Sequence, residues 1–400
     1  MEVSVTFGRY IVFHFHFGIP STVREDSVIL PQSLTLSREP PILVHSDTYD
    51  DDSVSDTIAV EPNIVGFSCT HHIAAITALA CYTNDELVFC GKDNGDITLY
   101  STATGMEVQT MYQHAKGIAI KLIEYGTQSN VLASADASSR VMVWKVARTG
   151  KAWAAKGPLL DARIPDYAIN QLLFDANNNW LLISTLISDI IYNVNSGIKK
   201  AVSMEKKVSR RWINHHHDPG KVICVTAEAA YIRSWEHLSD PDAAETKLVL
   251  NTNGPILVKD VAIHMNGCIL SIELSGSSSQ QSTFKILLLS ASSFDKSFAN
   301  TIEPVQRILS ISQKMRHVIG SHGKKFLFLD LGMWVCSLDL ETFESEYSRH
   351  CFIPNEWLST NWDLMMKVNQ KGDLIYVKGH ELAIIKRALD NKVGVSMKTG

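Results

Sequence analysis

The sequence of 400 residues has no excess of basic charge and no long apolar run. Its 37 Lys and Arg residues are outnumbered by 42 Asp and Glu residues, which gives a formal net charge of −5. Such a balance lacks the basic surface that nucleic acids and anionic lipids attract, so neither nucleic acid nor membrane is expected as a partner. The longest apolar stretch near the start, Ile11 to Ile19, is interrupted by His14 and His16. It is too short for a membrane-spanning helix and reads poorly as a secretory signal.

The seven cysteines are scattered and odd in number. No two of them are spaced as C-x-x-C, and the chain has no Asn-x-Ser/Thr glycosylation acceptor. The cysteine pattern predicts free thiols in a reducing compartment, and the missing acceptor favours an intracellular location. A cytoplasmic protein is therefore expected. With 45% hydrophobic and 20% charged residues, the composition is that of a globular protein and excludes a mostly disordered chain.

Signatures of catalysis and cofactor binding are also missing. No G-x-x-x-x-G-K-[ST] phosphate loop occurs, because Gly320 to Lys325 has the wrong glycine spacing, and G-x-S-x-G and H-E-x-x-H are absent. The run His215 to Asp218 carries metal-ligand side chains, but neighbours on a strand point to opposite faces. Pro219-Gly220 follows at once and predicts a solvated loop. We therefore expect no catalytic residue, no cofactor and no metal.

Two other groups of residues receive a structural interpretation. Cys351 beside His350 suggests a thiol nucleophile, yet side chains of neighbours on a strand diverge, and a packed core cysteine is expected. The densest basic stretch contains Lys206-Lys207 and Arg210-Arg211 and is interpreted as a solvated loop between repeats.

The first 62 residues differ from the rest of the chain. Two alternating runs within Met1 to Phe17 predict short strands, and prolines and the acidic run Asp50 to Asp52 follow. We predict an irregular and partly flexible segment over residues 1–62, a repeat domain over 63–388 and a tail over 389–400.

From about Ile64 onward, short apolar strands alternate with clusters of Gly, Asn, Asp and Ser, and two adjacent windows are similar. In each window a histidine precedes three strands, an aspartate lies in a turn, and an aromatic residue ends the following strand. The matched pairs are His72 with His114, Asp93 with Asp136, and Tyr100 with Trp144, which are 42, 43 and 44 positions apart. A period in the low forties with four strands per repeat is typical of β-propeller blades.

The sequence therefore predicts an all-β propeller of about seven four-stranded blades. Beyond the first two windows, blades are expected at about 168–202, 211–252, 257–303, 307–347 and 348–388. Their late strands are expected at Ile190 to Val194, Ala230 to Trp235, Phe284 to Leu289, Trp334 to Leu338 and Leu382 to Lys386. A large β-sandwich and two stacked barrels are the alternatives.

At these residues the chain resembles the WD-repeat β-propellers. In that family a turn Asp, a strand Ser or Thr, a His and a Trp form a buried hydrogen-bonded unit that fixes the blade. The resemblance implies such structural roles for His72, Asp93, Tyr100, His114, Ser134, Asp136 and Trp144. The match is partial, because Asp93 lies seven residues before Tyr100 whereas Asp136 lies eight before Trp144. Neither aromatic residue is followed by the aspartate of the family's dipeptide.

A narrower resemblance links the segments 91–95, 134–140, 351–358 and 383–387 to the C-terminal propellers of fungal NACHT–WD proteins. Those proteins are STAND-type signalling NTPases whose propeller is the sensing or interaction half. The resemblance implies a non-catalytic scaffold that binds other proteins. The alternatives are a propeller enzyme with a site in the central channel and an inactive fragment of a larger NACHT–WD protein.

Overall fold

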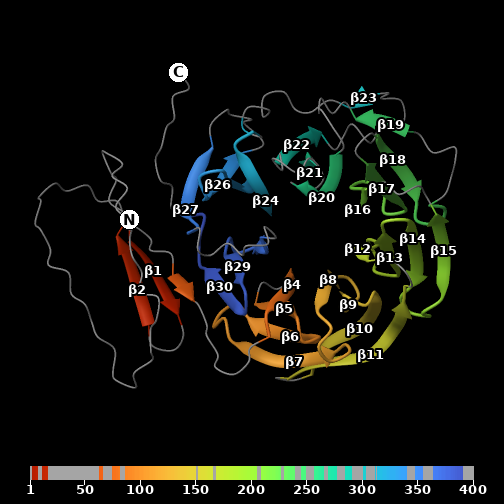
Figure 1. Cartoon of the computed structure of the whole chain (residues 1–400), viewed down its shortest axis with the longest axis horizontal. Coiled ribbons are helices and arrows are strands. Elements are labelled where there is room, and N and C mark those ends of the chain that lie inside the picture. Colours follow the sequence, from red (N-terminus) through yellow and green to blue (C-terminus); the bar gives the residue numbers. More distant parts are fainter. Residues whose placement is uncertain are drawn as a thin grey trace, which may run out of the picture.

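Runs of Val, Ile, Leu and aromatic residues, separated by turn residues, form strands along the whole chain. The computed structural model describes residues 2–7, 11–16, 63–65, 74–81, 86–149, 152–164, 168–204, 209–226, 229–238, 245–248, 256–264, 269–276, 284–290, 301–302, 311, 313–339, 347–354 and 364–390. All thirty regular elements within these residues are strands, and they form seven sheets arranged around one axis (Figure 1). The predicted all-β, seven-bladed propeller is confirmed.

Blades 1 to 3 are four-stranded antiparallel meanders whose first strand lies nearest the axis (Figure 1). Blade 1 consists of β4 (Ile76–Cys81), β5 (Leu87–Lys92), β6 (Asp96–Ser101) and β7 (Glu107–Gln113). Blade 2 consists of β8 (Ile120–Gly126), β9 (Val131–Asp136), β10 (Arg140–Thr149) and β11 (Ala152–Arg163). Blade 3 consists of β12 (Ile169–Phe174), β13 (Trp180–Thr185), β14 (Ser188–Asn193) and β15 (Lys199–Met204).

Blades 4 to 6 vary in strand number. Blade 4 consists of β16 (Arg210–Asn214), β17 (Lys221–Thr226), β18 (Ala229–Ser234) and β19 (Glu245–Leu248), with β23 (Thr301–Ile302) added in parallel to β19. Blade 5 has β20 (Ile256–His264), β21 (Ile269–Gly276) and β22 (Phe284–Ser290). Blade 6 consists of β24 (Met315–His322), β25 (Lys325–Asp330), β26 (Trp334–Asp339) and β27 (Ser348–Phe352).

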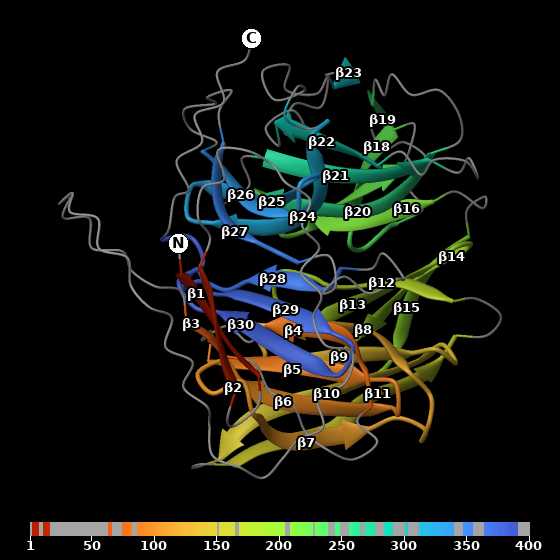
Figure 2. The same ribbon diagram turned by 60° about the vertical axis from the view of Figure 1, so that its left-hand side comes forward.

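Blade 7 joins the two ends of the described chain in one sheet. It contains β28 (Met366–Val368), β29 (Leu374–Lys378), β30 (Glu381–Ile385), β3 (Asn63–Val65), β1 (Glu2–Phe7) and β2 (Ile11–His16). Figure 2 shows β1, β2 and β3 beside β30. β3 is antiparallel to β30, with Val65 opposite Ile384. The sheet closes the ring with a strand from the opposite end of the sequence.

Two predicted blade boundaries are wrong. The window 348–388 was expected to be one blade, but its first strand, β27, is the outer strand of blade 6. The fourth position of blade 7 is taken by β3. The window 257–303 was also expected to be one blade, but β23 pairs with blade 4. The five predicted late strands are confirmed as third strands, since they coincide with β14, β18, β22, β26 and β30.

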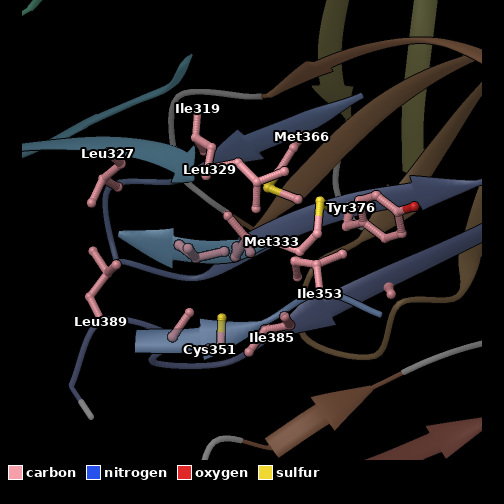
Figure 3. Close-up of a cluster of buried hydrophobic side chains, with 14 residues drawn as sticks. Ile319, Leu327, Leu329, Met333, Cys351, Ile353, Met366, Tyr376, Ile385 and Leu389 are labelled. Atoms are coloured by element: carbon pink, nitrogen blue, oxygen red, sulfur yellow. The ribbon is translucent and has the colours of Figure 1, made fainter. Parts of the chain in front are cut away.

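The hydrophobic core lies between adjacent blades, because both faces of every sheet are covered by neighbours. All six residues of β5 and of β9 are buried. Between blades 6 and 7, Leu329 of β25 packs in one cluster with Tyr376 of β29 and Ile385 of β30 (Figure 3). Cys351 belongs to this cluster, and burial raises the pKa of its thiol to about 12. The prediction of a packed core cysteine is confirmed.

Within the described residues, no helix has the length and apolar character needed to cross a lipid bilayer.

Candidate functional site

The turns between second and third strands all lie at one end of the ring, since each blade is a meander that starts on its inner strand. We call this end the 2–3 turn face. In the described residues it is formed by 93–95, 137–139, 186–187, 331–333 and 379–380. Three of the residues predicted to be structural, His114, Ser134 and Asp136, lie just beneath one of these turns.

In blade 2 the structure brings together three of those predicted residues. His114 Nδ1 lies 2.9 Å from Asp136 Oδ2, and His114 Nε2 lies 2.7 Å from Ser134 Oγ. The Tyr112 hydroxyl is 2.9 Å from the same Ser134 oxygen. His114 and Tyr112 come from the end of blade 1, so the unit ties two blades together.

The hydrogen bonds of this unit have one consistent direction. Burial lowers the pKa of His114, and the bond to Asp136 offsets this only in part, so the ring is neutral near pH 7. Burial opposes ionisation of Asp136, but the bonds from Ser138, the Arg140 amide and His114 outweigh it and lower the pKa of Asp136. An ionised carboxylate only accepts, so Nδ1 carries the proton and Nε2 accepts from Ser134.

The order Ser134, His114, Asp136 is that of a serine-hydrolase triad, but the surroundings are not. The three residues are buried, and the Ser134 oxygen is already bonded to both the His114 ring and the Tyr112 hydroxyl. A nucleophile needs open space beside its oxygen for a substrate carbonyl. This arrangement therefore holds a turn in place, as a fully satisfied buried polar network does.

Trp144 is placed differently from the prediction. It was expected to be buried, with His114 and Asp136 nearby, yet its side chain is half-buried and is stacked on Tyr112 with ring centroids 4.9 Å apart. The indole Nε1 has no hydrogen-bond partner among the described residues. Tyr112 reaches Ser134 with its hydroxyl and takes the position that the indole N–H was expected to fill.

The predicted role of Asp93 is wrong, because its side chain is exposed. Lys92 occupies the position of Asp136, since Lys92 pairs with Ile76 as Asp136 pairs with Ile120. The blade repeat is therefore 44 residues at this turn, and the adjacent Asp93 falls one position beyond it.

Blade 1 fills the same place with a different set of contacts. Lys92 donates a hydrogen bond to Glu107 at 2.8 Å, and the buried Tyr100 hydroxyl reaches the same carboxylate oxygen at 3.4 Å. His72 lies outside the described residues.

Sequence reasoning missed Asp330, the equivalent of Asp136 in blade 6. Asp330 pairs with Met315, the first residue of its blade, and its Oδ1 accepts the amide of Trp334 at 2.8 Å, as Asp136 accepts that of Arg140. Arg349 binds Asp330 Oδ2 through Nε and Nη2. The detectable signal was an aspartate that ends an apolar strand and is followed by a three-residue turn.

A second missed aspartate ties blade 3 to blade 4. Asp189 is buried and accepts bonds from Arg210 Nε at 2.6 Å, Trp212 Nε1 at 3.0 Å and the Ser184 hydroxyl. The predicted solvated basic loop is therefore wrong for Arg210, which lies in β16 as a buried ion-pair partner. Lys206 and Lys207 lie outside the described residues.

The same turns expose large apolar side chains. Leu331 directly follows Asp330 and is 63% exposed, and Leu186 precedes Asp189 in its turn and is 42% exposed. The Leu186 carbonyl accepts a bond from Arg210 Nη1, and the Leu331 amide bonds the Lys314 carbonyl. Leu257, at the same end of β20, is 49% exposed. The Asp189–Arg210 and Asp330–Arg349 ion pairs thus fix the turns that carry Leu186 and Leu331.

The run His215 to Asp218 is only partly the solvated loop that was predicted. His217 is exposed, but His215 is buried, and its Nδ1 accepts the amides of His217 and Asp218 at 3.3 and 3.1 Å. His215 therefore shapes the turn from inside. No group of three metal-ligating side chains occurs in the part of the chain that the structure describes.

Four charged residues lie on the inner strands of four different blades. They are Glu124 on β8, Arg211 on β16, Asp260 on β20 and Lys367 on β28. Burial first, and then the charge of Asp260, raises the pKa of Glu124 to about 7, against the opposing charge of Lys367. Burial lowers the pKa of Arg211, and Asp260 partly restores it. Charged residues of different blades thus interact with one another through these inner strands.

Together the ring of blades and the buried turn anchors define the protein as a seven-bladed β-propeller. No family model matches the sequence, and no curated protein matches it.

Proposed function

We propose that the chain is a non-catalytic platform that binds other proteins through the 2–3 turn face. The observation that carries this proposal is the presentation of Leu186, Leu257 and Leu331 at one end of the ring. Exposed apolar side chains on a rigid scaffold are a common basis of protein recognition, because little conformational entropy is lost on binding. Proteins are the proposed partners, since a net charge of −5 offers little to nucleic acid or anionic lipid.

The test compares two sets of variants of the intact chain as bait. Leu186→Ser, Leu257→Ser and Leu331→Ser are combined in one protein. The control combines Met106→Ser and Ile198→Ser, which alter equally exposed apolar residues in turns between third and fourth strands, at the opposite end of the ring. Quantitative mass spectrometry of captured proteins should show specific partners lost by the triple variant and retained by the control. Equal capture by both would refute the use of this face.

A propeller enzyme with a site on the axis is the second candidate. The observation that favours it is the set of charges from four blades, which includes a carboxyl group with a raised pKa. Carboxyl groups with raised pKa values are common among general acids. The test is an activity screen of the parent against Glu124→Gln, because a hydrolytic or proton-transfer activity that disappears with this change would assign the axis a catalytic role.

The narrower proposal is that this platform is the sensing or interaction half of a STAND-type signalling protein in the cytoplasm. It is supported by the resemblance to NACHT–WD propellers and by seven blades. Cys90, Cys336 and Cys351 are free thiols, which is consistent with a reducing compartment. Co-purification of the chain with a nucleotide-binding domain would support this proposal, and its absence from cytoplasmic fractions would refute the location.

A further inference from the structure

Five inner strands carry a β-bulge close to their start, at the end of the ring that bears the 2–3 turns. In β4, β8, β12, β20 and β24 the pairing with the second strand skips one residue there. A bulge leaves its extra residue outside the regular ladder, and bulges are common beside binding sites. The five extra residues are Thr77, Lys121, Asn170, Lys259 and Arg316.

Three of these extra residues are basic, and blade 4 adds a fourth cation. Arg211 is the second residue of β16, as Lys121 is of β8 and Arg316 is of β24. We call Lys121, Arg211, Lys259 and Arg316 the basic rim. Its members belong to blades 2, 4, 5 and 6, whose inner strands lie nearest the axis (Figure 1).

The basic rim gives this end of the ring a local positive charge. Lys121 is exposed, and the other three members are half-buried. Arg211 donates a hydrogen bond to the Lys259 carbonyl at 2.8 Å and so joins blades 4 and 5 at the rim. Asp260 is the one acidic residue directly beside a member of the rim in the sequence, so the rim is basic although the whole chain has a net charge of −5.

The basic rim lies close to two of the exposed leucines of the same face. Leu257 precedes Lys259 by two residues on β20. The Leu331 amide bonds the Lys314 carbonyl, and Lys314 is itself exposed two residues before Arg316. Apolar and basic side chains are therefore neighbours on blades 5 and 6, and a partner that matches both carries apolar and acidic side chains.

We propose that the partner segment bound on the 2–3 turn face is acidic. Its Asp and Glu side chains pair with the basic rim, and its apolar side chains contact the leucines. This proposal rests on the proposed function and adds the chemistry of the partner. Because the four cations belong to four blades around the axis, several carboxylates along one chain match their distribution, whereas a single small anion matches only part of it. Complementary charge of this kind speeds association and selects the partner.

The experiment selects short peptides from a random phage-displayed library on the intact chain at low salt. We expect the selected peptides to contain more Asp and Glu, together with more Leu, Ile or Phe, than the input library. The affinity of the best synthetic peptide should fall about tenfold or more between about 50 and 300 mM salt, because salt screens charges at the surface.

A variant of the rim tests the site. Lys121→Gln, Lys259→Gln and Arg316→Gln are combined in one protein and should weaken binding of the selected peptide about tenfold or more. Arg211 is left intact, because its bond to the Lys259 carbonyl joins two blades. Lys121→Gln alone changes an exposed residue and should weaken binding a few-fold, which separates a lost contact from a misfolded variant.

The control removes the same number of charges toward the opposite end of the ring. It combines Lys156→Gln, Lys199→Gln and Lys371→Gln, which alter exposed lysines, and should bind the peptide like the parent. The triple leucine variant separates this proposal from the proposed function. If the rim is used but the leucines are not, the leucine variant keeps the apolar enrichment, whereas the rim variant still loses the acidic one.

Three results would overturn the proposal. Selected peptides without acidic enrichment, or no selected peptide at all, would contradict an acidic partner. Equal weakening by the rim variant and the control would contradict the rim as the site. A short oligothymidylate that binds the parent as tightly as the peptide, and is lost with the rim variant, would assign the rim to nucleic acid instead.

Discussion

Three buried aspartates near the 2–3 turns each bond a side chain from another strand. Asp136 bonds His114, whereas Asp189 and Asp330 bond Arg210 and Arg349. Asp136 and Asp330 also accept the amide four residues ahead, and this bond closes the turn. The shared requirement is a carboxylate below the turn, since several N–H donors converge there and would otherwise be buried without acceptors.

The contrast between Asp136 and Asp93 tests this requirement. Asp136→Ala should lower the free energy of unfolding by about 2 to 4 kcal/mol, because it leaves the His114 Nδ1–H and the turn amides without an acceptor. Asp93→Ala changes an exposed turn aspartate and should stay within about 0.5 kcal/mol of the parent. Denaturant melts of the two variants provide the comparison, and equal losses would contradict the assigned anchor.

His264 predicts a pH dependence of stability. It is buried against Phe326 and bonds Ser271 through Nε2 at 2.7 Å, and burial lowers its pKa from 6.5 to about 4. The unfolded chain therefore binds a proton more readily than the folded one between these two values. This contribution to stability is present above pH 6.5 and is lost as the pH falls toward 4, by about 3 kcal/mol.

The variant His264→Gln keeps a polar group near Ser271 but does not titrate. Its melts, compared with those of the parent from pH 7 to pH 4, should show a flatter loss of stability. Parallel profiles for parent and variant would show that His264 does not carry this dependence.

At the scale of the strand, side-chain amides replace the missing backbone pairing between blades. Gln171 of β12 donates to the Trp212 carbonyl at 2.6 Å and accepts the Trp212 amide at 2.7 Å. Gln109 of β7 makes the same pair of bonds with Trp153 of the next blade. Each glutamine thus acts like one residue of an additional strand that joins two sheets.

Replacing Gln171 measures the worth of one such link. Gln171→Leu keeps the side-chain volume and leaves the two backbone groups of Trp212 without their partner, so we expect a loss of about 2 kcal/mol. Gln113→Leu is the control, because the Gln113 amide bonds Asp96 at the surface, and should cost less than about 0.5 kcal/mol. Chemical denaturation of both variants distinguishes a link between blades from a surface contact.

The same scale shows what the sequence could predict and what it could not. The third strands were predictable, because each is a short apolar run between turn residues, as in Trp334 to Leu338. The partner of Asp189 was not, since Arg210 lies 21 residues ahead in the next blade, and neither residue belongs to a motif. Matching Asp93 with Asp136 by identity missed that Lys92 holds the equivalent position.

For the whole molecule, ring closure was the least predictable feature. β3 pairs with β30 across more than three hundred residues, and a three-residue strand carries little pattern of its own. The cost of bringing distant segments together grows only slowly with the length of the intervening chain, so closure by an N-terminal strand is thermodynamically accessible. Closure also brings the inner strands of all blades around one axis.

The axial charges give the last prediction, and its sign is opposite to that of His264. The pKa of Glu124 rises from 4.5 to about 7 in the folded ring, so the folded protein binds this proton more tightly than the unfolded chain does. This contribution to stability is therefore present below pH 4.5 and is lost as the pH rises toward 7. Glu124→Gln remains neutral, so it should gain about 1 to 2 kcal/mol over the parent at pH 8, a value reduced for partial exposure to solvent, and nothing at pH 4.5.

Lys367→Gln removes the favourable charge and should lose stability at pH 8 instead. Melts of the three proteins at both pH values measure this, and equal shifts for the two variants would mean that Glu124 does not sense the charge of Lys367.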